Sequence, residues 1–211
     1  MNIKEISASA VFGAIVTILS LTISRLLTYP IIPYLKFDIA EIIEVLSLLL
    51  FGPAVAFSIA ILHFLGLVIS EGIFPAPVPL IGPFMKFLAV FSTLIGLYIG
   101  LKYFKLPFVY RLFFALFLSL MFRNVIMTVA NYFVLITLYA PFVSGTANII
   151  SQLTGIKMEP ITLILIFTAV YNTLHVFIAF IPAYLIALIP FMPNLIRPIT
   201  EHWLLNIKNK K

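Results

Sequence analysis

The sequence predicts an all-α integral membrane protein, a bundle of six transmembrane helices formed by residues 1–211 as a single membrane domain. Of these residues 63% are hydrophobic and only 9% are charged. Soluble domains are, in contrast, roughly 45–50% apolar and about 25% charged. The apolar residues form runs long enough to cross a bilayer, and no polar linker or low-complexity tract divides the chain.

The expected helices are separated by loops rich in proline and by the Gly52-Pro53 turn. They are Ser7–Thr28, Ile39–Phe51, Ala54–Glu71, Phe84–Tyr103, Val109–Tyr139 and a sixth that begins near Ile161. Ile39–Phe51 is short for a span, so we expect it either to tilt into the bundle with its acidic residues near the outer surface or to lie at the membrane interface. Asp38 is expected to cap it, with Glu41 completing a variant of the capping box. Residues 141–160 are expected to form an outer loop.

Basic residues give the predicted orientation. They gather between the fourth and fifth spans and in the tail, at Lys102, Lys105, Arg111, Lys208, Lys210 and Lys211. With six spans, these residues and the N-terminus share one side, which the positive-inside rule makes cytoplasmic. The loops after the first and third spans then face outside, and the protein is a multi-pass protein of the cell membrane. The net charge of +6 is scattered, so no basic stripe predicts a nucleic-acid partner.

Several kinds of chemistry have no signature in this sequence. The chain has no cysteine, which excludes disulfides and thiolate metal sites, and no second ligand stands at a useful spacing from His63. We therefore expect no metal, and we expect His63 to be hydrogen-bonded to a neighbour. No P-loop, H-E-x-x-H or G-x-S-x-G motif occurs. These absences predict a binding protein or transporter subunit without a cofactor, not an enzyme.

The fifth span carries the first polar face. Asn124, Met127, Thr128 and Asn131 share one side of a helix, with Arg123 beside them. A charged residue in a membrane helix usually faces the bundle interior and often marks a substrate path. The alternative is that these side chains only join helices by hydrogen bonds. We favour a ligand site because the polar face is long.

The sixth span carries a second polar face, formed by Thr168, Asn172 and His175 next to Tyr171. Asn131 and Asn172 are both expected about 12 to 17 Å below the outer surface, so the two faces can meet. The result is a pocket open to the outside and roofed by the first and third loops.

Other residues are candidates for the rim and walls of this pocket. Lys86 is expected either to reach the membrane surface or, pointed inward, to act as a donor over the pocket mouth. Tyr132, Phe37 and Phe84 are candidate apolar or stacking walls. In the first span, Ala10 and Ala14 are small residues four apart, which allows another helix to approach closely.

Taken together, these residues resemble an S component of an energy-coupling factor (ECF) vitamin transporter, most similar to the riboflavin-specific group. The resemblance rests on YLKFDIAEIIEVLSLLLFGPAVA in the first loop and second helix, GPFMKFLA in the fourth span, MTVANYFVLITLYAP in the fifth and YNTLH in the sixth. The segment from Ala10 to Ala14 matches the alanine motif by which S components dock on their coupling protein.

The resemblance implies a protein that captures riboflavin from outside and pairs with a transmembrane coupling protein and two ATPase subunits. Asn131, Asn172 and His175 would hydrogen-bond the flavin, and the first loop from Leu35 through Lys36 and Phe37 to Asp38 would close over its ring. Ala10 and Ala14 would carry docking.

Two positions depart from the family pattern: His175 stands where lysine is expected, and Lys86 where a neutral amide is expected. An added cation would suit an anionic ligand such as flavin mononucleotide. The open alternatives are an S component for that compound or for another vitamin or precursor, and a structural membrane protein.

Overall fold

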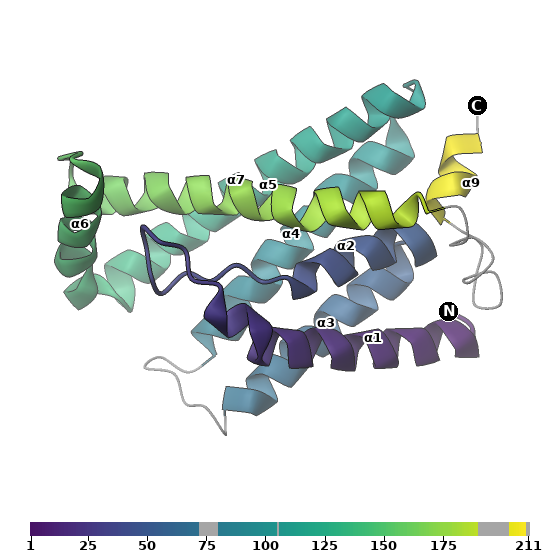
Figure 1. Ribbon diagram of the computed structural model, residues 1–211, viewed down its shortest axis with the longest axis horizontal. Helices are drawn as coiled ribbons and strands as arrows, with labels where there is room; N and C mark the ends of the chain where they lie inside the picture. Colours follow the sequence, from purple (N-terminus) through teal and green to yellow (C-terminus); the bar gives the residue numbers. More distant parts are fainter. Residues whose placement is uncertain (72–79, 105, 190–202, 210–211) are drawn as a thin grey trace.

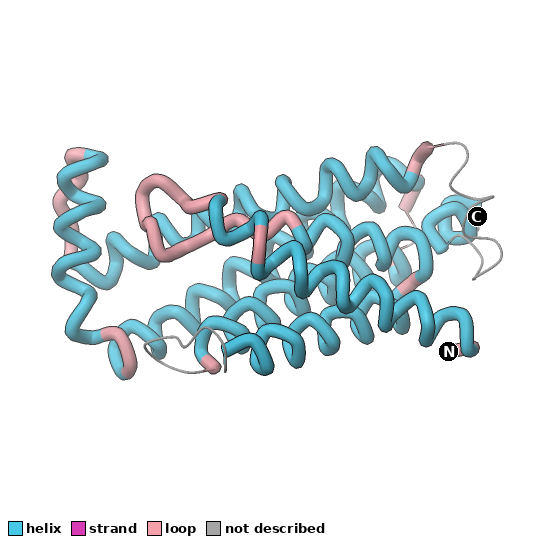
Figure 2. Tube along the Cα trace, turned by 60° about the horizontal axis from the view of Figure 1, so that its bottom comes forward, coloured by secondary structure: helices cyan, strands magenta, loops and turns pink. Residues whose placement is uncertain are grey.

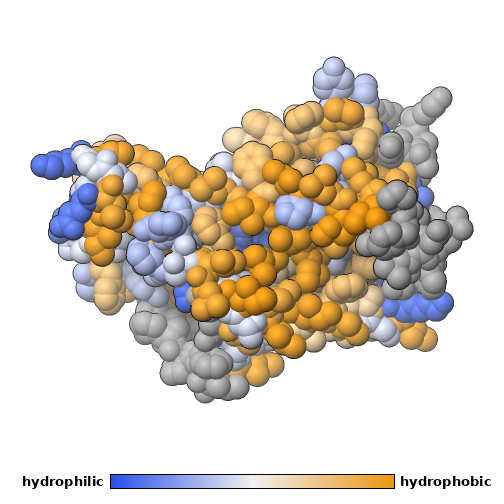
Figure 3. All heavy atoms as spheres, in the orientation of Figure 1, coloured by the Kyte–Doolittle hydropathy of each residue, from blue (hydrophilic) through white to orange (hydrophobic). Residues whose placement is uncertain are grey.

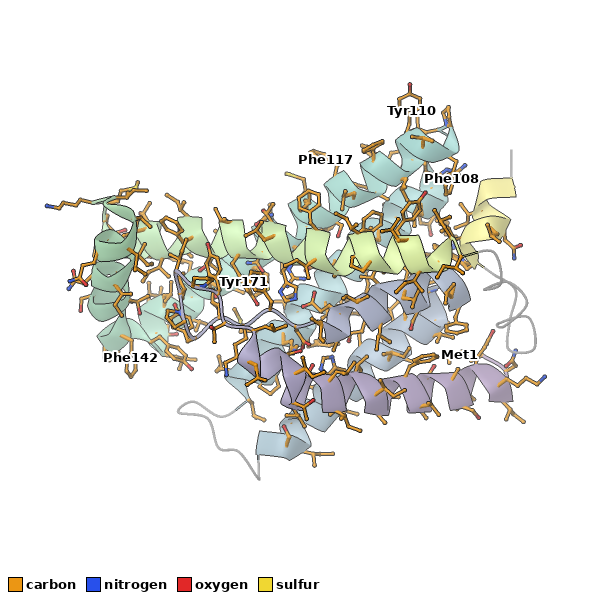
Figure 4. The ribbon with its side chains drawn as sticks, in the orientation of Figure 1. Met1, Phe108, Tyr110, Phe117, Phe142 and Tyr171 are labelled. Carbon is orange, nitrogen blue, oxygen red and sulfur yellow. The ribbon has the colours of Figure 1, made fainter. Side chains whose placement is uncertain are left out.

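Helices form nearly all of the regular structure in the computed structural model, which describes residues 1–71, 80–104, 106–189 and 203–209 (Figure 1). Five of them are long and apolar enough to cross a membrane. They are α1 (Ile3–Leu21), α3 (Pro53–Glu71), α4 (Ile81–Tyr103), α5 (Phe108–Thr137) and α7 (Pro160–Ala187). Apolar side chains cover most of the visible helix surface (Figure 3), and Tyr110 and Phe117 point away from the bundle (Figure 4). The chain is a multi-pass membrane protein.

Helix α2 (Ala40–Phe51) has 12 residues and lies inside the bundle, packed against α1, α3 and α7. Glu41 is 2% exposed and Glu44 is 0% exposed, so of the two predicted alternatives the interfacial helix is wrong. The N-cap residue is Ile39 and not Asp38 as expected, although Asp38 Oδ1 accepts the N–H of Ala40, the first residue of the helix, at 2.9 Å. Glu41 does not complete a capping box, because its carboxylate is bonded to a buried arginine.

The first span is shorter than predicted. Helix α1 ends at Leu21 and is followed by the 3-10 turn η1 (Ile23–Leu26) and then by residues 28–39, which we call the first loop. Two prolines keep the first loop out of a helix, and it folds back on itself as a narrow hairpin (Figure 2). Its backbone bonds run from Tyr29 N–H to Leu35 O at 2.8 Å and from Phe37 N–H to Leu27 O at 2.7 Å.

Residues 141–160 are expected to lack a helix, and this expectation is wrong for most of their length. The segment contains helix α6 (Ala140–Thr154), which crosses one end of the bundle (Figure 1). Pro141 lies in the first turn, where a helix needs no N–H donor, and Gly155 ends the helix at φ +74°. Ala147 and Ile150 face the bundle, so a segment that looked polar is an amphipathic helix.

The other end of the bundle holds the start of α1 and helix α9 (Trp203–Asn209) (Figure 1). Trp203 packs against Gly52, whose φ of +92° makes the expected turn between α2 and α3. The third loop, with most of its residues at 72–79, and Lys105, Lys210 and Lys211 lie outside the described residues. The roof predicted from the third loop is therefore an expectation only.

Helices α4 and α5 make the closest contact in the bundle. A Cβ atom added to Gly96 would lie 2.4 Å from Ser119 Cα, and one added to Gly100 would lie 2.2 Å from Ala115 Cα. Both neighbours are backbone atoms of α5, which no rotamer change can move. Glycine is therefore required at this crossing for the two backbones to touch.

We expect Gly100→Ala to destabilise the protein by roughly 1–3 kcal/mol, since the new methyl group overlaps the α5 backbone. The matched control is Gly145→Ala in α6, where an added Cβ meets no atom within 4 Å. That change is expected to stabilise the helix by up to about 1 kcal/mol. Thermal unfolding in detergent measures both, and equal shifts would show that the α4–α5 contact is not tight.

Candidate functional site

A cavity of about 510 Å³ lies between the first loop and helices α2, α4, α5 and α7. This volume is in the range of pockets that hold drug-sized ligands, roughly 300–1,000 Å³. Its lining is Tyr34, Leu35, Lys36, Asp38, Glu41, Ile81, Gly82, Met85, Lys86, Ala89, Arg123, Met127, Asn131, Val134, Leu135, Tyr139, Thr168, Tyr171, Asn172 and His175. Apolar walls with a few converging polar groups are typical of a small-molecule site.

Arg123 and Glu41, which both line this pocket, form a bidentate ion pair. Arg123 Nη1 lies 2.6 Å from Glu41 Oε2, and Nη2 lies 3.2 Å from Oε1. The arginine, 1% exposed, also donates to Thr93 Oγ1 and to Asn172 Oδ1, both at 3.1 Å. Planar guanidinium geometry suits such a fork, and each further bond offsets the cost of burying charge. Arg123 thus lies at the centre of the polar cluster rather than beside it.

His175 and Tyr171 join α7 to the first loop. Tyr171 Oη donates its only proton to Lys36 O at 2.5 Å, toward the first loop in Figure 4. It therefore accepts from His175 Nδ1, which is 3.1 Å away. His175 Nε2 accepts the N–H of Asp38 at 3.1 Å and lies 3.3 Å from Glu41 Oε1. The imidazole consequently fixes the backbone of the first loop beside the pocket.

A second polar cluster lies between α1, α2 and α3. His63 Nδ1 is 2.9 Å from Glu44 Oε1, and His63 Nε2 is 2.8 Å from Ser20 Oγ. Ser20 continues the chain of contacts to the carboxylate of Asp38. This confirms that His63 is hydrogen-bonded to neighbours, and the described ranges contain no group of acids and histidines that would hold a metal ion.

The structure gathers most of the predicted site residues around the pocket. Those in its lining are Leu35, Lys36, Asp38, Lys86, Asn131, Asn172 and His175. Phe37 lies behind the lining, with its ring centroid 5.1 Å from that of Tyr171. Tyr132 is 44% exposed and Phe84 is 49% exposed, and neither is brought to the pocket. Asn124 also lies outside it, where its amide donates to Thr173 Oγ1 at 3.0 Å.

Glu41 is the functional side chain that sequence reasoning placed wrongly. The sequence pattern after Asp38 predicts a helix-capping role for Glu41. Arg123 in a membrane helix, however, favours a carboxylate partner in the bundle, and this preference is the signal that points to Glu41. Met85, Val134 and Leu135 also line the pocket. Their sequence context does not distinguish them from other apolar residues of membrane helices.

No protein-family model and no curated protein matches this sequence. A solved structure does: the S component of a bacterial ECF transporter, with a TM-score of 0.62. The two chains are 24% identical, and the match covers 87% of this chain and 92% of the other. The chain has the fold of an ECF-transporter S component. The S-component fold predicted from the motifs is thus confirmed, and it places four of the quoted sequence stretches, from the first loop, α4, α5 and α7, around one pocket.

The ion pair between Arg123 and Glu41 should contribute to the stability of the fold. We expect Arg123→Met to destabilise the protein by roughly 3–5 kcal/mol, because Glu41 would be left buried without a cation. Adding Glu41→Gln should recover much of the loss. The measurement is thermal unfolding in detergent, with Lys102→Met on the exposed end of α4 as the control. Additive losses in the double variant would contradict the pairing.

Proposed function

We propose that this chain is the substrate-capture subunit, or S component, of an ECF transporter, and that it binds riboflavin from outside the cell for ATP-driven uptake. The observation that carries the proposal is an apolar pocket of about 510 Å³ with converging amide groups in a chain of S-component fold. The riboflavin assignment is supported by the sequence motifs, which contribute residues to this pocket from the first loop, α4, α5 and α7. In this proposal the protein captures and releases its ligand without covalent chemistry, so it is a transporter subunit and not an enzyme.

Two asparagines offer complementary groups to a flavin. Asn131 Nδ2 donates to Met127 O at 2.7 Å, which leaves its carbonyl oxygen to accept a bond from the ligand. Asn172 Oδ1 accepts from Arg123 Nε, which leaves the amide N–H groups of Asn172 to donate. A flavin presents one ring N–H between two carbonyl groups, so one acceptor and one donor match its polar edge. Leu35 and Lys36 would then cover the ring, with Phe37 behind them.

The proposed orientation puts the pocket outside and both termini in the cytoplasm, with α2 as the short sixth helix of the bundle. The start of α1 and helix α9 lie at one end of the molecule (Figure 1). The pocket takes its α4 residues from Ile81 to Ala89, at the opposite end of that helix from Lys102. Lys102 would therefore face the cytoplasm, in agreement with the positive-inside rule.

Docking on a coupling protein is proposed for the exposed face of α1. Ala10 and Ala14 are exposed, whereas Gly13 faces α3, where an added Cβ would lie 2.8 Å from Leu62 Cβ. The alanines thus leave a shallow strip of helix free for another helix to approach. The coupling protein and two ATPase subunits would supply the energy for uptake.

A second candidate ligand is flavin mononucleotide. Lys86 is paired with Asp38, and Arg123 is paired with Glu41. Lys36 is exposed at the pocket and makes no ion pair with any acidic residue that the structure describes. A phosphate group on the ligand would complement this lysine.

We expect purified protein to quench riboflavin fluorescence saturably, and Asn131→Ala to weaken binding by about 10-fold or more through the lost hydrogen bond. The matched control is Asn124→Ala, on the same helix but outside the pocket, which should bind within about 3-fold of the parent. If both variants only lower thermal stability to the same degree, the asparagines join helices and the structural alternative is favoured.

Competition in the same titration separates the ligands. Displacement of riboflavin by flavin mononucleotide would support the second candidate, and displacement by thiamin would contradict the flavin assignment. Absence of quenching by folded, ligand-free protein would exclude riboflavin as the ligand.

We expect Ala10→Trp to abolish riboflavin uptake by cells while leaving riboflavin binding by the purified protein unchanged. The indole would fill the strip of α1 that is proposed to meet the coupling protein. Ile15→Trp, at an exposed position on a different side of α1, is the control for bulk on this helix. Normal uptake by the Ala10 variant would exclude this docking site.

A further inference from the structure

The carboxylate of Asp38, at the end of the first loop, collects four donors while it is 2% exposed. Ser20 Oγ and Ser24 Oγ donate to it, each at 2.5 Å, and the N–H of Ala40 donates at 2.9 Å. The fourth donor is the ammonium group of Lys86, which forms an ion pair with Asp38 Oδ2. Lys86 also donates to Ser20 Oγ at 3.0 Å.

These four donors differ in where they come from. Ser20, Ser24 and Ala40 belong to the segments that flank the first loop in the chain. Lys86 comes from α4, whereas Tyr171 and His175, which also bond to the loop, come from α7. Lys86 is the donor that connects the first loop to the α4 wall. The loop covers the pocket with Leu35 and Lys36.

We propose that Lys86 and Asp38 form a latch that holds the first loop closed over the pocket, and that Lys86 is a positioning residue rather than a ligand contact. The proposal deepens the proposed function and rests on it only in that the pocket takes a substrate. A charge pair that bridges a loop and a helix stabilises the closed arrangement selectively, because opening the loop separates the charges. Substrate entry and exit then require this pair to break.

The chain has no cysteine, so one introduced thiol can report on opening of the first loop. Ile32, a first-loop residue that is 0% exposed and packs in an apolar cluster with Ile150 and Leu163, is replaced in Ile32→Cys. The reaction of the new thiol with a charged maleimide is followed in ligand-free protein. Burial should keep the rate low, and Lys86→Met in this background should raise it by about 10-fold or more, because reactivity tracks the open population. Lys86→Arg, which keeps the charge, should stay near the parental rate.

Two controls separate the latch from general loosening. Lys102→Met removes another lysine of α4 and should leave the rate unchanged. Ala183→Cys, in the core of the bundle at 0% exposure, should stay unreactive when Lys86→Met is added. A rise at both introduced cysteines, or no rise at Ile32→Cys, overturns the latch.

Asp38→Asn closes a double-mutant cycle. If the two residues act through one interaction, Asp38→Asn raises the rate and Lys86→Met adds little to it, whereas independent additive effects overturn the proposal.

Riboflavin is then added to the parent. A latch effect in ligand-free protein without any protection by riboflavin would remove the proposed ligand and keep the latch. Protection by riboflavin with no effect of Lys86→Met would support the proposed ligand and overturn the latch.

Discussion

The bidentate pair between Arg123 and Glu41 is the interaction on which the rest of the structure depends. A charge inside a membrane protein is costly, and here two opposite charges meet from different helices with further bonds to Thr93 and Asn172. The pair draws α2 into the interior and sets α4, α5 and α7 around it. The pocket lies directly beside this pair, so one cluster of polar groups both organises the helices and forms part of the site.

The first loop is held by apolar packing as well as by polar contacts. Its Tyr29 and Ile32 are buried in an apolar cluster with side chains of α5, α6 and α7. Its backbone is fixed by Tyr171 and His175 on one side and its Asp38 carboxylate by α1 and α4 on the other. Opening the first loop would exchange its polar contacts for bonds with water and would also expose its apolar cluster. The pocket is therefore bounded by helices and by a loop that both kinds of contact hold in place.

Much of this arrangement could be predicted from the sequence. The long apolar runs predict the membrane helices, the prolines predict the first loop, and the two polar faces with Asn131 and Asn172 meet at one pocket as expected. The misplaced features have physical reasons. Helix α6 is amphipathic rather than uniformly apolar, so it resembled a loop, and Glu41 satisfied a local capping pattern while its true partner lies far along the chain. Phe37 and Tyr132 are candidate pocket walls because they are aromatic, but aromatic character does not specify which way a side chain points, and neither lines the pocket.

The glycine contact between α4 and α5 bears on how new ligand preferences could arise. Backbones that touch at Gly96 and Gly100 leave α4 and α5 no room to move closer at this crossing, which lies beyond the pocket-lining part of α4. Under the proposed function, a change in ligand size would then have to be met by the side chains that line the pocket and not by closer packing of these two helices. A library confined to residues 34–36, which line the pocket, would vary the proposed ligand site while leaving the buried bonds of Asp38 in place. The same division would let evolution retune selectivity without rebuilding the membrane domain.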